Sequence, residues 1–191
     1  MADSRQDRRE FFREFLRRYV VPAADFVEDR LDAAVPKPRL LLRPPGALTE
    51  AAFLETCHRC GHCVDACPAG AIRVLRVRDE RRNETPYIDP QRQPCVVCDE
   101  LACMQVCPSG ALRKLPLEEI RIGLARVDQE TCVRSRDEDC RQCVDLCPLG
   151  RQAIHIDERD LVEVHAAGCI GCGICEHACP TSPKSIVVER F

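Results

Sequence analysis

Apolar residues recur at spacings of three or four through the first part of the chain. The positions are Phe12, Leu16, Val20, Ala23, Val27, Leu31 and Ala34. This spacing predicts an amphipathic helical segment over residues 1–35. Pro22 lies inside it, and because proline has no amide proton for a helix interior, we expect it to split or kink the helix. Such a segment packs on its own domain, or docks to a partner or a membrane surface.

Beyond this segment the pattern changes to short apolar runs. Residues 36–47 contain Pro36, Pro38, Pro44 and Pro45 and are predicted to form an extended linker. A short helix is expected at 51–54. The apolar runs after it are short enough for strands of a small sheet protein. The strands expected from these runs are 72–77, 87–89, 111–113, 125–128, 153–156, 161–165 and 185–188.

Cysteine occupies the loops between these runs. The chain has 16 cysteines, which fall into four motifs that each end in Cys-Pro. Motif one is Cys57, Cys60, Cys63 and Cys67; motif two is Cys95, Cys98, Cys103 and Cys107; motif three is Cys132, Cys140, Cys143 and Cys147; motif four is Cys169, Cys172, Cys175 and Cys179. The first cysteines lie 38, 37 and 37 residues apart, a period that indicates an internal repeat.

The spacing within the motifs identifies their chemistry. Motifs one and four read C-x2-C-x2-C-x3-C-P, the run of bacterial ferredoxins, in which the fourth cysteine binds the other cluster of a pair. Motif two has four residues between its second and third cysteines, and motif three has seven between its first and second. A disulfide framework gives no reason for proline after every fourth cysteine, and zinc modules pair two C-x2-C knuckles across a longer spacer. We therefore predict four [4Fe–4S] clusters, bound by all 16 cysteines.

Composition agrees with a fold built around clusters. Aromatic residues make up only 4% of the chain and tryptophan is absent, so an ordinary hydrophobic core would be thin. Metal binding would then supply much of the folding free energy, and we expect the metal-free protein to be largely unfolded. The predicted fold is α+β, a duplicated dicluster ferredoxin over residues 48–191 with an N-terminal helical extension.

Other function classes find little support in the sequence. The net charge of −3 does not suggest a nucleic-acid partner, and no apolar run approaches the length of a membrane span. Glu118 and Glu119 suggest a solvated helix face rather than a catalytic pair, so we predict no catalytic residues. His58, His62 and His177 lie within the cysteine loops and are expected to face solvent or to tune a cluster through hydrogen bonds. His155 and His165 are expected to be structural.

Several stretches outside the cysteines resemble one family. The sequence contains Thr85-Pro86-Tyr87-Ile88, the run Cys107-Pro108-Ser109-Gly110-Ala111-Leu112, and the segment 117–125, LEEIRIGLA. Together with the stretched third motif, they look like MauM/NapG-type ferredoxins over about residues 46–191. The resemblance implies a polyferredoxin with no catalysis of its own, an electron-transfer protein or subunit that relays single electrons through four [4Fe–4S] clusters between a quinol- or ferredoxin-type donor and a redox enzyme. Its implied partners are redox proteins: a membrane quinol-oxidising or ferredoxin-type donor, and a reductase or dehydrogenase.

Two ways of pairing the motifs are open, because each fourth cysteine is expected to bind a neighbouring cluster. Sequential pairing joins one with two and three with four. Nested pairing joins one with four and two with three, as in related four-cluster subunits of molybdenum oxidoreductases, and the matching spacings of motifs one and four favour it. The nested sets are Cys57, Cys60, Cys63 with Cys179; Cys169, Cys172, Cys175 with Cys67; Cys95, Cys98, Cys103 with Cys147; and Cys132, Cys140, Cys143 with Cys107.

The N-terminus bears on the compartment. Residues 7–13, DRREFFR, resemble the head of a twin-arginine export signal, which the family members carry, but charged residues follow where such a signal needs an apolar segment. We therefore predict a cytoplasmic protein, membrane-associated through partners, with periplasmic export through a degenerate Arg8-Arg9 signal as the alternative. The alternative function is a cluster-carrying assembly or maturation factor for a redox enzyme.

Overall fold

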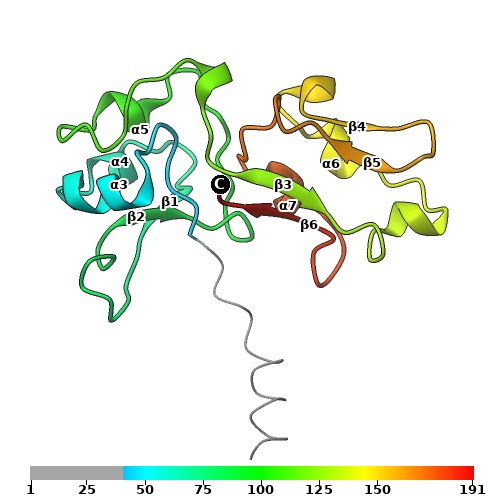
Figure 1. Cartoon of the computed structure of the whole chain (residues 1–191), viewed down its shortest axis with the longest axis horizontal. Coiled ribbons are helices and arrows are strands. Elements are labelled where there is room, and N and C mark those ends of the chain that lie inside the picture. Colours follow the sequence, from blue (N-terminus) through cyan, green and yellow to red (C-terminus); the bar gives the residue numbers. More distant parts are fainter. Residues whose placement is uncertain (1–40) are drawn as a thin grey trace, which may run out of the picture. The chain divides into compact units, whose positions relative to one another are not determined.

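The computed structural model describes residues 41–191, which belong to one unit of the fold. Short helices and strands alternate with long loops (Figure 1). The helices are α3 (Glu50–Thr56), α4 (His62–Asp65), α5 (Ala102–Gln105), α6 (Gln142–Asp145) and α7 (Ile174–Ala178). The strands are β1 (Ile72–Val74), β2 (Pro86–Ile88), β3 (Leu124–Val127), β4 (Ile154–Ile156), β5 (Val162–Val164) and β6 (Ile186–Glu189). Single turns of 3-10 helix lie at Leu117–Glu119, Val133–Arg136 and Gly150–Gln152.

The strands form three antiparallel pairs that divide the unit into two modules. We call residues 41–113 the first module and residues 124–189 the second module. The first module contains the hairpin β1–β2, and the second contains the hairpin β4–β5. Strands β3 and β6 join the two ends of the second module (Figure 1). In the first module this outer pair is reduced to one bridge between Ala47 and Leu112.

The predicted elements lie close to the observed ones. Helix α3 extends the predicted helix by one residue at its start and two at its end, and six of the seven predicted strands overlap an observed strand. The prediction of a strand at 111–113 was wrong, because the only strand-like pairing of this run is the single bridge at Leu112. The α+β architecture is thus as predicted for the described residues. The predicted helical segment over residues 1–35 lies outside them.

The linker prediction over residues 36–47 needs correction in its described part, which begins at Leu41. Leu42 pairs with Ile88 across a β-bridge, and residues 42–46 are buried. The Arg43 guanidinium donates hydrogen bonds to both Glu50 carboxylate oxygens, at 2.8 and 2.9 Å, and to Thr85 Oγ1 at 2.9 Å. The stretch turns at Pro45 and Gly46, packs as part of the first module and does not act as a spacer.

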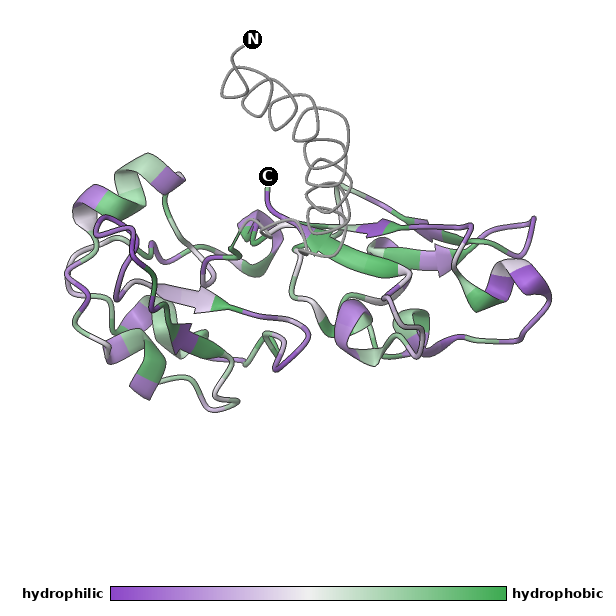
Figure 2. Cartoon of the chain, turned by 90° about the horizontal axis from the view of Figure 1, so that it is seen from below, coloured by the Kyte–Doolittle hydropathy of each residue, from purple (hydrophilic) through white to green (hydrophobic). Residues whose placement is uncertain are grey.

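The core is aliphatic and contains many of the cysteines. Phe53 and Ile120 are fully buried, and Ile122 and Ile170 are nearly so. Figure 2 shows that hydrophobic segments are short and alternate with hydrophilic ones along the described chain. Within residues 41–191, no helix is both long and apolar enough to cross a membrane. With so few aromatic side chains, the thiols themselves supply a substantial part of the buried surface.

The connection between the modules, residues 114–123, is packed against the second module. Ile120 and Ile122 are buried, and the Ile122 N–H donates to the Ile170 carbonyl of the second module at 2.8 Å. Gly123 lies directly beneath Gly171: a Cβ atom on Gly171 would come within 2.4 Å of the Gly123 backbone. Gly171 also has a φ of +73°, which glycine adopts without strain. This contact explains two features of the family-like segment, its isoleucines and its glycine.

Candidate metal centres

Four hollows in the described structure are each lined by four cysteines. In every hollow, three cysteines come from one motif and the fourth from the neighbouring motif in sequence. We number the sites by the motif that gives three thiols. Site 1 is Cys57, Cys60, Cys63 and Cys107; site 2 is Cys95, Cys98, Cys103 and Cys67; site 3 is Cys132, Cys140, Cys143 and Cys179; site 4 is Cys169, Cys172, Cys175 and Cys147. The space free of protein atoms is similar in all four, about 350 to 420 Å³ with some open solvent included.

These sets contradict the nested pairing. Nesting placed Cys67 with motif four and Cys179 with motif one, but Cys67 lies with motif two and Cys179 with motif three. Within the first module α4 packs on α5, and within the second α6 packs on α7. Motif spacing was a poor guide because it constrains only the local loop that presents three thiols. The partner motif is set by the hairpins β1–β2 and β4–β5, which follow the Cys-Pro of motifs one and three and return the chain to the same module.

In motifs one, two and four the loop turns sharply just before the third cysteine. Gly61 and Gly173 precede α4 and α7 with φ values of +80° and +90°, which suit glycine. In motif two, which has two extra residues between its second and third cysteines, Leu101 takes this place with a φ of +45°. A non-glycine residue in this region is strained, so the longer spacing of motif two retains the same turn at an energetic cost.

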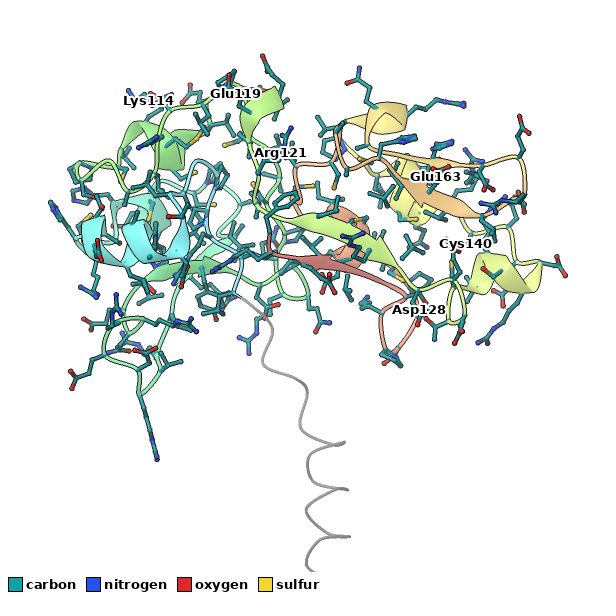
Figure 3. The ribbon with its side chains drawn as sticks, viewed as in Figure 1. Lys114, Glu119, Arg121, Asp128, Cys140 and Glu163 are labelled. Atoms are coloured by element: carbon teal, nitrogen blue, oxygen red, sulfur yellow. The ribbon has the colours of Figure 1, made fainter. Side chains whose placement is uncertain are left out.

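The insertion in motif three is held by an arginine. Residues Val133–Arg136 form a 3-10 turn, and the buried Arg134 side chain donates to the Asp139 carboxylate and the Asp160 carbonyl, both at 2.9 Å. Arg134 also pairs with the Asp160 carboxylate. The insertion is therefore fastened to the turn between β4 and β5. Figure 3 labels Cys140, the cysteine that follows the insertion.

Burial governs the protonation of most thiols. It raises the pKa of Cys103 and Cys172 to about 12, and that of Cys63, Cys95 and Cys143 to about 11, with neighbouring thiols of the same site adding to the effect. The pKa of Cys175 is raised as well, for the same reason. These groups are thiols at neutral pH in the absence of metal. Because metals bind thiolates, loading of the sites must release protons.

The direction of the pKa shift differs among the fourth cysteines of the motifs. Burial acts to raise the pKa of Cys107 and of Cys179, but hydrogen bonds from neighbouring backbone and hydroxyl groups outweigh it, and both pKa values are lowered. For Cys147 burial prevails and the pKa is raised. Cys67 accepts a hydrogen bond from the Ala71 N–H at 3.3 Å. The sulfur environment thus varies among four otherwise repeated motifs.

The two modules meet where site 2 adjoins site 4. The Cys95 N–H donates to the Cys172 carbonyl at 3.0 Å, so a cysteine of one site is hydrogen-bonded to a cysteine of the other. His177 Nδ1 lies 3.1 Å from the Pro90 carbonyl, and a Cβ on Gly173 would clash with the Pro90 ring. Contacts therefore connect the sites in the order 1, 2, 4, 3.

The remaining predicted residues are placed as follows. His58 and His62 are exposed, while His177 is at the module contact. His155 and His165 stack with ring centroids 4.6 Å apart, in agreement with a structural role. Glu118 and Glu119 are exposed on a single 3-10 turn, and Figure 3 shows Glu119 on this turn in the connection between the modules. The exposure of both glutamates agrees with the predicted solvated face.

Sequence reasoning missed two polar groups at the sites. Ser109 Oγ lies 3.6 Å from Cys107 Sγ, and Thr181 Oγ1 lies 3.1 Å from Cys179 Sγ. The signal was available in the sequence, because each hydroxyl residue follows its Cys-Pro directly. A comparison of the residue after Cys-Pro in all four motifs would have found both.

Known protein families identify the class of this chain. Two family models, both described as a 4Fe-4S dicluster domain, match residues 56–111 and 125–186. These ranges fall within the first and second modules. The protein is therefore of the dicluster ferredoxin class, with two such domains in tandem, and its 16 cysteines fit four [4Fe–4S] clusters.

Relatives narrow the class further. The methylamine utilization ferredoxin-type protein MauM of Paracoccus denitrificans is 38% identical over 77% of this chain and 70% of its own length. MauM of Methylobacillus flagellatus is 36% identical over 95% of this chain and 83% of its own length. The ferredoxin-type protein NapG of Escherichia coli is 35% identical over 77% of this chain and 69% of its own length. The chain belongs to this family of MauM and NapG ferredoxin-type proteins, and the resemblance seen in the sequence is confirmed.

Proposed function

We propose that this chain is an electron-transfer protein that relays single electrons through four [4Fe–4S] clusters, between a quinol- or ferredoxin-type donor and a redox enzyme. The observation that carries the proposal is the arrangement of 16 thiols in four sets that adjoin one another in series. A bound [4Fe–4S] cluster supplies a group that takes up and gives back one electron. Clusters far apart could stabilise the fold equally well, but clusters that adjoin one another in series allow electrons to pass from one to the next.

The proposed ligands are the four sets described above. Each set offers four thiols, which are the donors that iron–sulfur clusters require. Since every cubane would have all its irons occupied by cysteine, none offers an open iron to a substrate. We therefore propose a carrier without catalysis of its own, which acts with redox enzymes as a partner or subunit.

The residues at the module contact have a definite part in this function. The hydrogen bond from the Cys95 N–H to the Cys172 carbonyl joins the backbones of two proposed ligands. Pro90, Gly173 and His177 hold the loops on either side of it. These groups fix the separation of sites 2 and 4, on which transfer between the modules depends.

The partners are proposed from the family. The relatives are named for methylamine utilization and as ferredoxin-type proteins, so we propose redox proteins as donor and acceptor: a membrane quinol-oxidising subunit, a reductase or a dehydrogenase. The cytoplasm is still the predicted compartment, and Arg8-Arg9 lies outside the described residues. Fractionation of native cells, with the protein detected by antibody, tests this prediction.

The proposal is tested on protein purified without oxygen. We expect about sixteen iron atoms and sixteen acid-labile sulfides per chain, four of each per cubane, and reversible bleaching of the visible absorption by dithionite. An anaerobic pull-down from native cells should recover a quinol oxidoreductase or a redox enzyme. Zinc without sulfide would refute the proposal. Clusters that pass intact to an apo-enzyme would instead support a maturation factor.

A further inference from the structure

The residue that follows each Cys-Pro divides the four sites into two kinds. Ser109 follows Cys107-Pro108, and Thr181 follows Cys179-Pro180. These two cysteines are the fourth members of sites 1 and 3. The fourth members of sites 2 and 4 are followed by the apolar residues Ala69 and Leu149. Hydroxyl groups in this position thus belong to the first and last sites of the series 1, 2, 4, 3.

At Thr181 the surrounding groups leave the hydroxyl proton free to point at the cysteine sulfur. A threonine hydroxyl has one proton and two lone pairs. The Ser185 N–H donates to Thr181 Oγ1 at 2.8 Å, and the buried Ser185 hydroxyl lies 2.8 Å from the same oxygen. If both Ser185 groups donate, the lone pairs are used and the proton is directed to Cys179 Sγ, 3.1 Å away. A metal-bound thiolate has no proton, so it can only accept.

At Ser109 the same arrangement is looser. The Ala111 N–H donates to Ser109 Oγ at 3.3 Å, which leaves the hydroxyl proton for Cys107 Sγ at 3.6 Å. The motif-one loop is nearly identical, since Pro-Ser-Gly-Ala at 108–111 matches Pro-Ala-Gly-Ala at 68–71. Gly110 and Gly70 have φ values of +73° and +60°. The two loops thus share a backbone form and differ by one hydroxyl.

We propose that Ser109 and Thr181 raise the reduction potentials of the clusters bound at sites 1 and 3 above those at sites 2 and 4. The inference rests on the proposed function. Reduction adds negative charge to the cluster and its thiolates, and a hydrogen bond to a ligand sulfur stabilises that charge. The shorter contact at Thr181 should have the larger effect. Electrons would then occupy the clusters at the outer sites 1 and 3 first. The clusters at the inner sites 2 and 4 would pass electrons on without staying reduced.

The test is a redox titration of the full loaded protein followed by electron paramagnetic resonance. Thr181→Val should move one of the midpoints to a more negative potential, and Ser109→Ala should move a different one by a smaller amount. Ala69→Ser places the hydroxyl in the matching loop of motif one and should move a third midpoint to a more positive potential. Thr181→Ser retains the hydroxyl and should leave all midpoints unchanged.

Each outcome has a defined meaning when iron and sulfide are measured first. If the unmutated protein holds no iron–sulfur clusters, the proposed function itself fails. If the variants are fully loaded but Thr181→Val and Ser109→Ala leave the midpoints in place, or shift them to more positive values, the inference alone is overturned. Should Thr181→Val fail to load, Ala69→Ser decides the question: a positive shift supports the inference, and no shift overturns it.

Discussion

The two modules hold the same pair of sites with different supports. The second module closes its ends with the four-residue pairing of β3 and β6, whereas the first has only the bridge between Ala47 and Leu112. The start of the first module is held instead by a buried ion pair that ties it to α3 and β2: Arg43 binds Glu50, Thr85 and Pro86. The comparison teaches that two modules with the same pair of sites are stabilised by different contacts, strand pairing in one and buried charge in the other.

Both modules use a buried arginine, but the partners differ. The Glu50 side chain is 13% exposed, while the Asp139 and Asp160 side chains bound by Arg134 are 84% and 68% exposed. Carboxylates this exposed can be hydrated when their partner is lost. Glu50 is nearly buried and also pairs with Arg190 at 2.8 Å, so its loss leaves two arginines without a carboxylate. We therefore expect the first module to be the more sensitive of the two to loss of its ion pair.

Removal of the clusters should have the largest effect and would erase the difference between the modules. Chelation of iron from the purified protein leaves buried thiols and a thin core, so we expect both modules to lose cooperative unfolding. Circular dichroism and calorimetry of the metal-free protein measure this. A cooperative transition that remains after metal removal would show that one module folds by its strands or ion pairs alone.

Double substitutions of cysteine test whether each module holds its own sites. Cys57 and Cys107 share site 1, so Cys57→Ala with Cys107→Ala should remove about a quarter of the iron, as either change alone would. Cys57→Ala with Cys179→Ala affects both modules and should remove about half. Iron analysis of the four variants decides between module-local and nested pairing, because nesting predicts the reverse.

The ion pairs can be compared directly. Glu50→Ala leaves the guanidinium of Arg43, which is 4% exposed, without its carboxylate, and we expect a loss of about 3–5 kcal/mol. Asp139→Ala leaves Arg134 its bonds to Asp160 and should lower stability by about 1 kcal/mol or less. The thermal midpoint of cluster loss, read by visible absorption, measures both. Equal effects would mean that the first module does not depend on this ion pair.

The two modules also differ in net charge, from which we expect the smallest effect. Nine basic and nine acidic residues balance in residues 41–113, while seven basic and twelve acidic residues leave residues 124–189 with a net charge of −5. We expect a small cationic reductant to reduce the protein faster than an anionic one of equal driving force, with the advantage lost at high salt. Stopped-flow absorption at two ionic strengths measures it. No salt dependence would show that electrons enter without regard to this charge.

The sequence predicted the parts of the structure that depend on local pattern. Apolar runs located six strands, and the Cys-Pro motifs located every thiol, because strands and cysteine loops are set by near neighbours. Pairing of the motifs could not be predicted, since it depends on how a hairpin returns the chain. The buried Arg43 was hidden within a proline-rich stretch that has the composition of a linker. Ser109 and Thr181 can be read in the sequence, but only their distances to the Cys107 and Cys179 sulfur atoms indicate what they do.

The stacking of Gly171 on Gly123 has a consequence for how such chains can be recombined. Neither position accepts a side chain, because a Cβ on Gly171 meets the Gly123 backbone and a Cβ on Gly123 would come 2.4 Å from the Glu189 carbonyl. A dicluster domain grafted from a relative therefore has to bring its own preceding segment with it. The natural boundary for shuffling falls before Ile120, in the connection, rather than at the first strand of the domain.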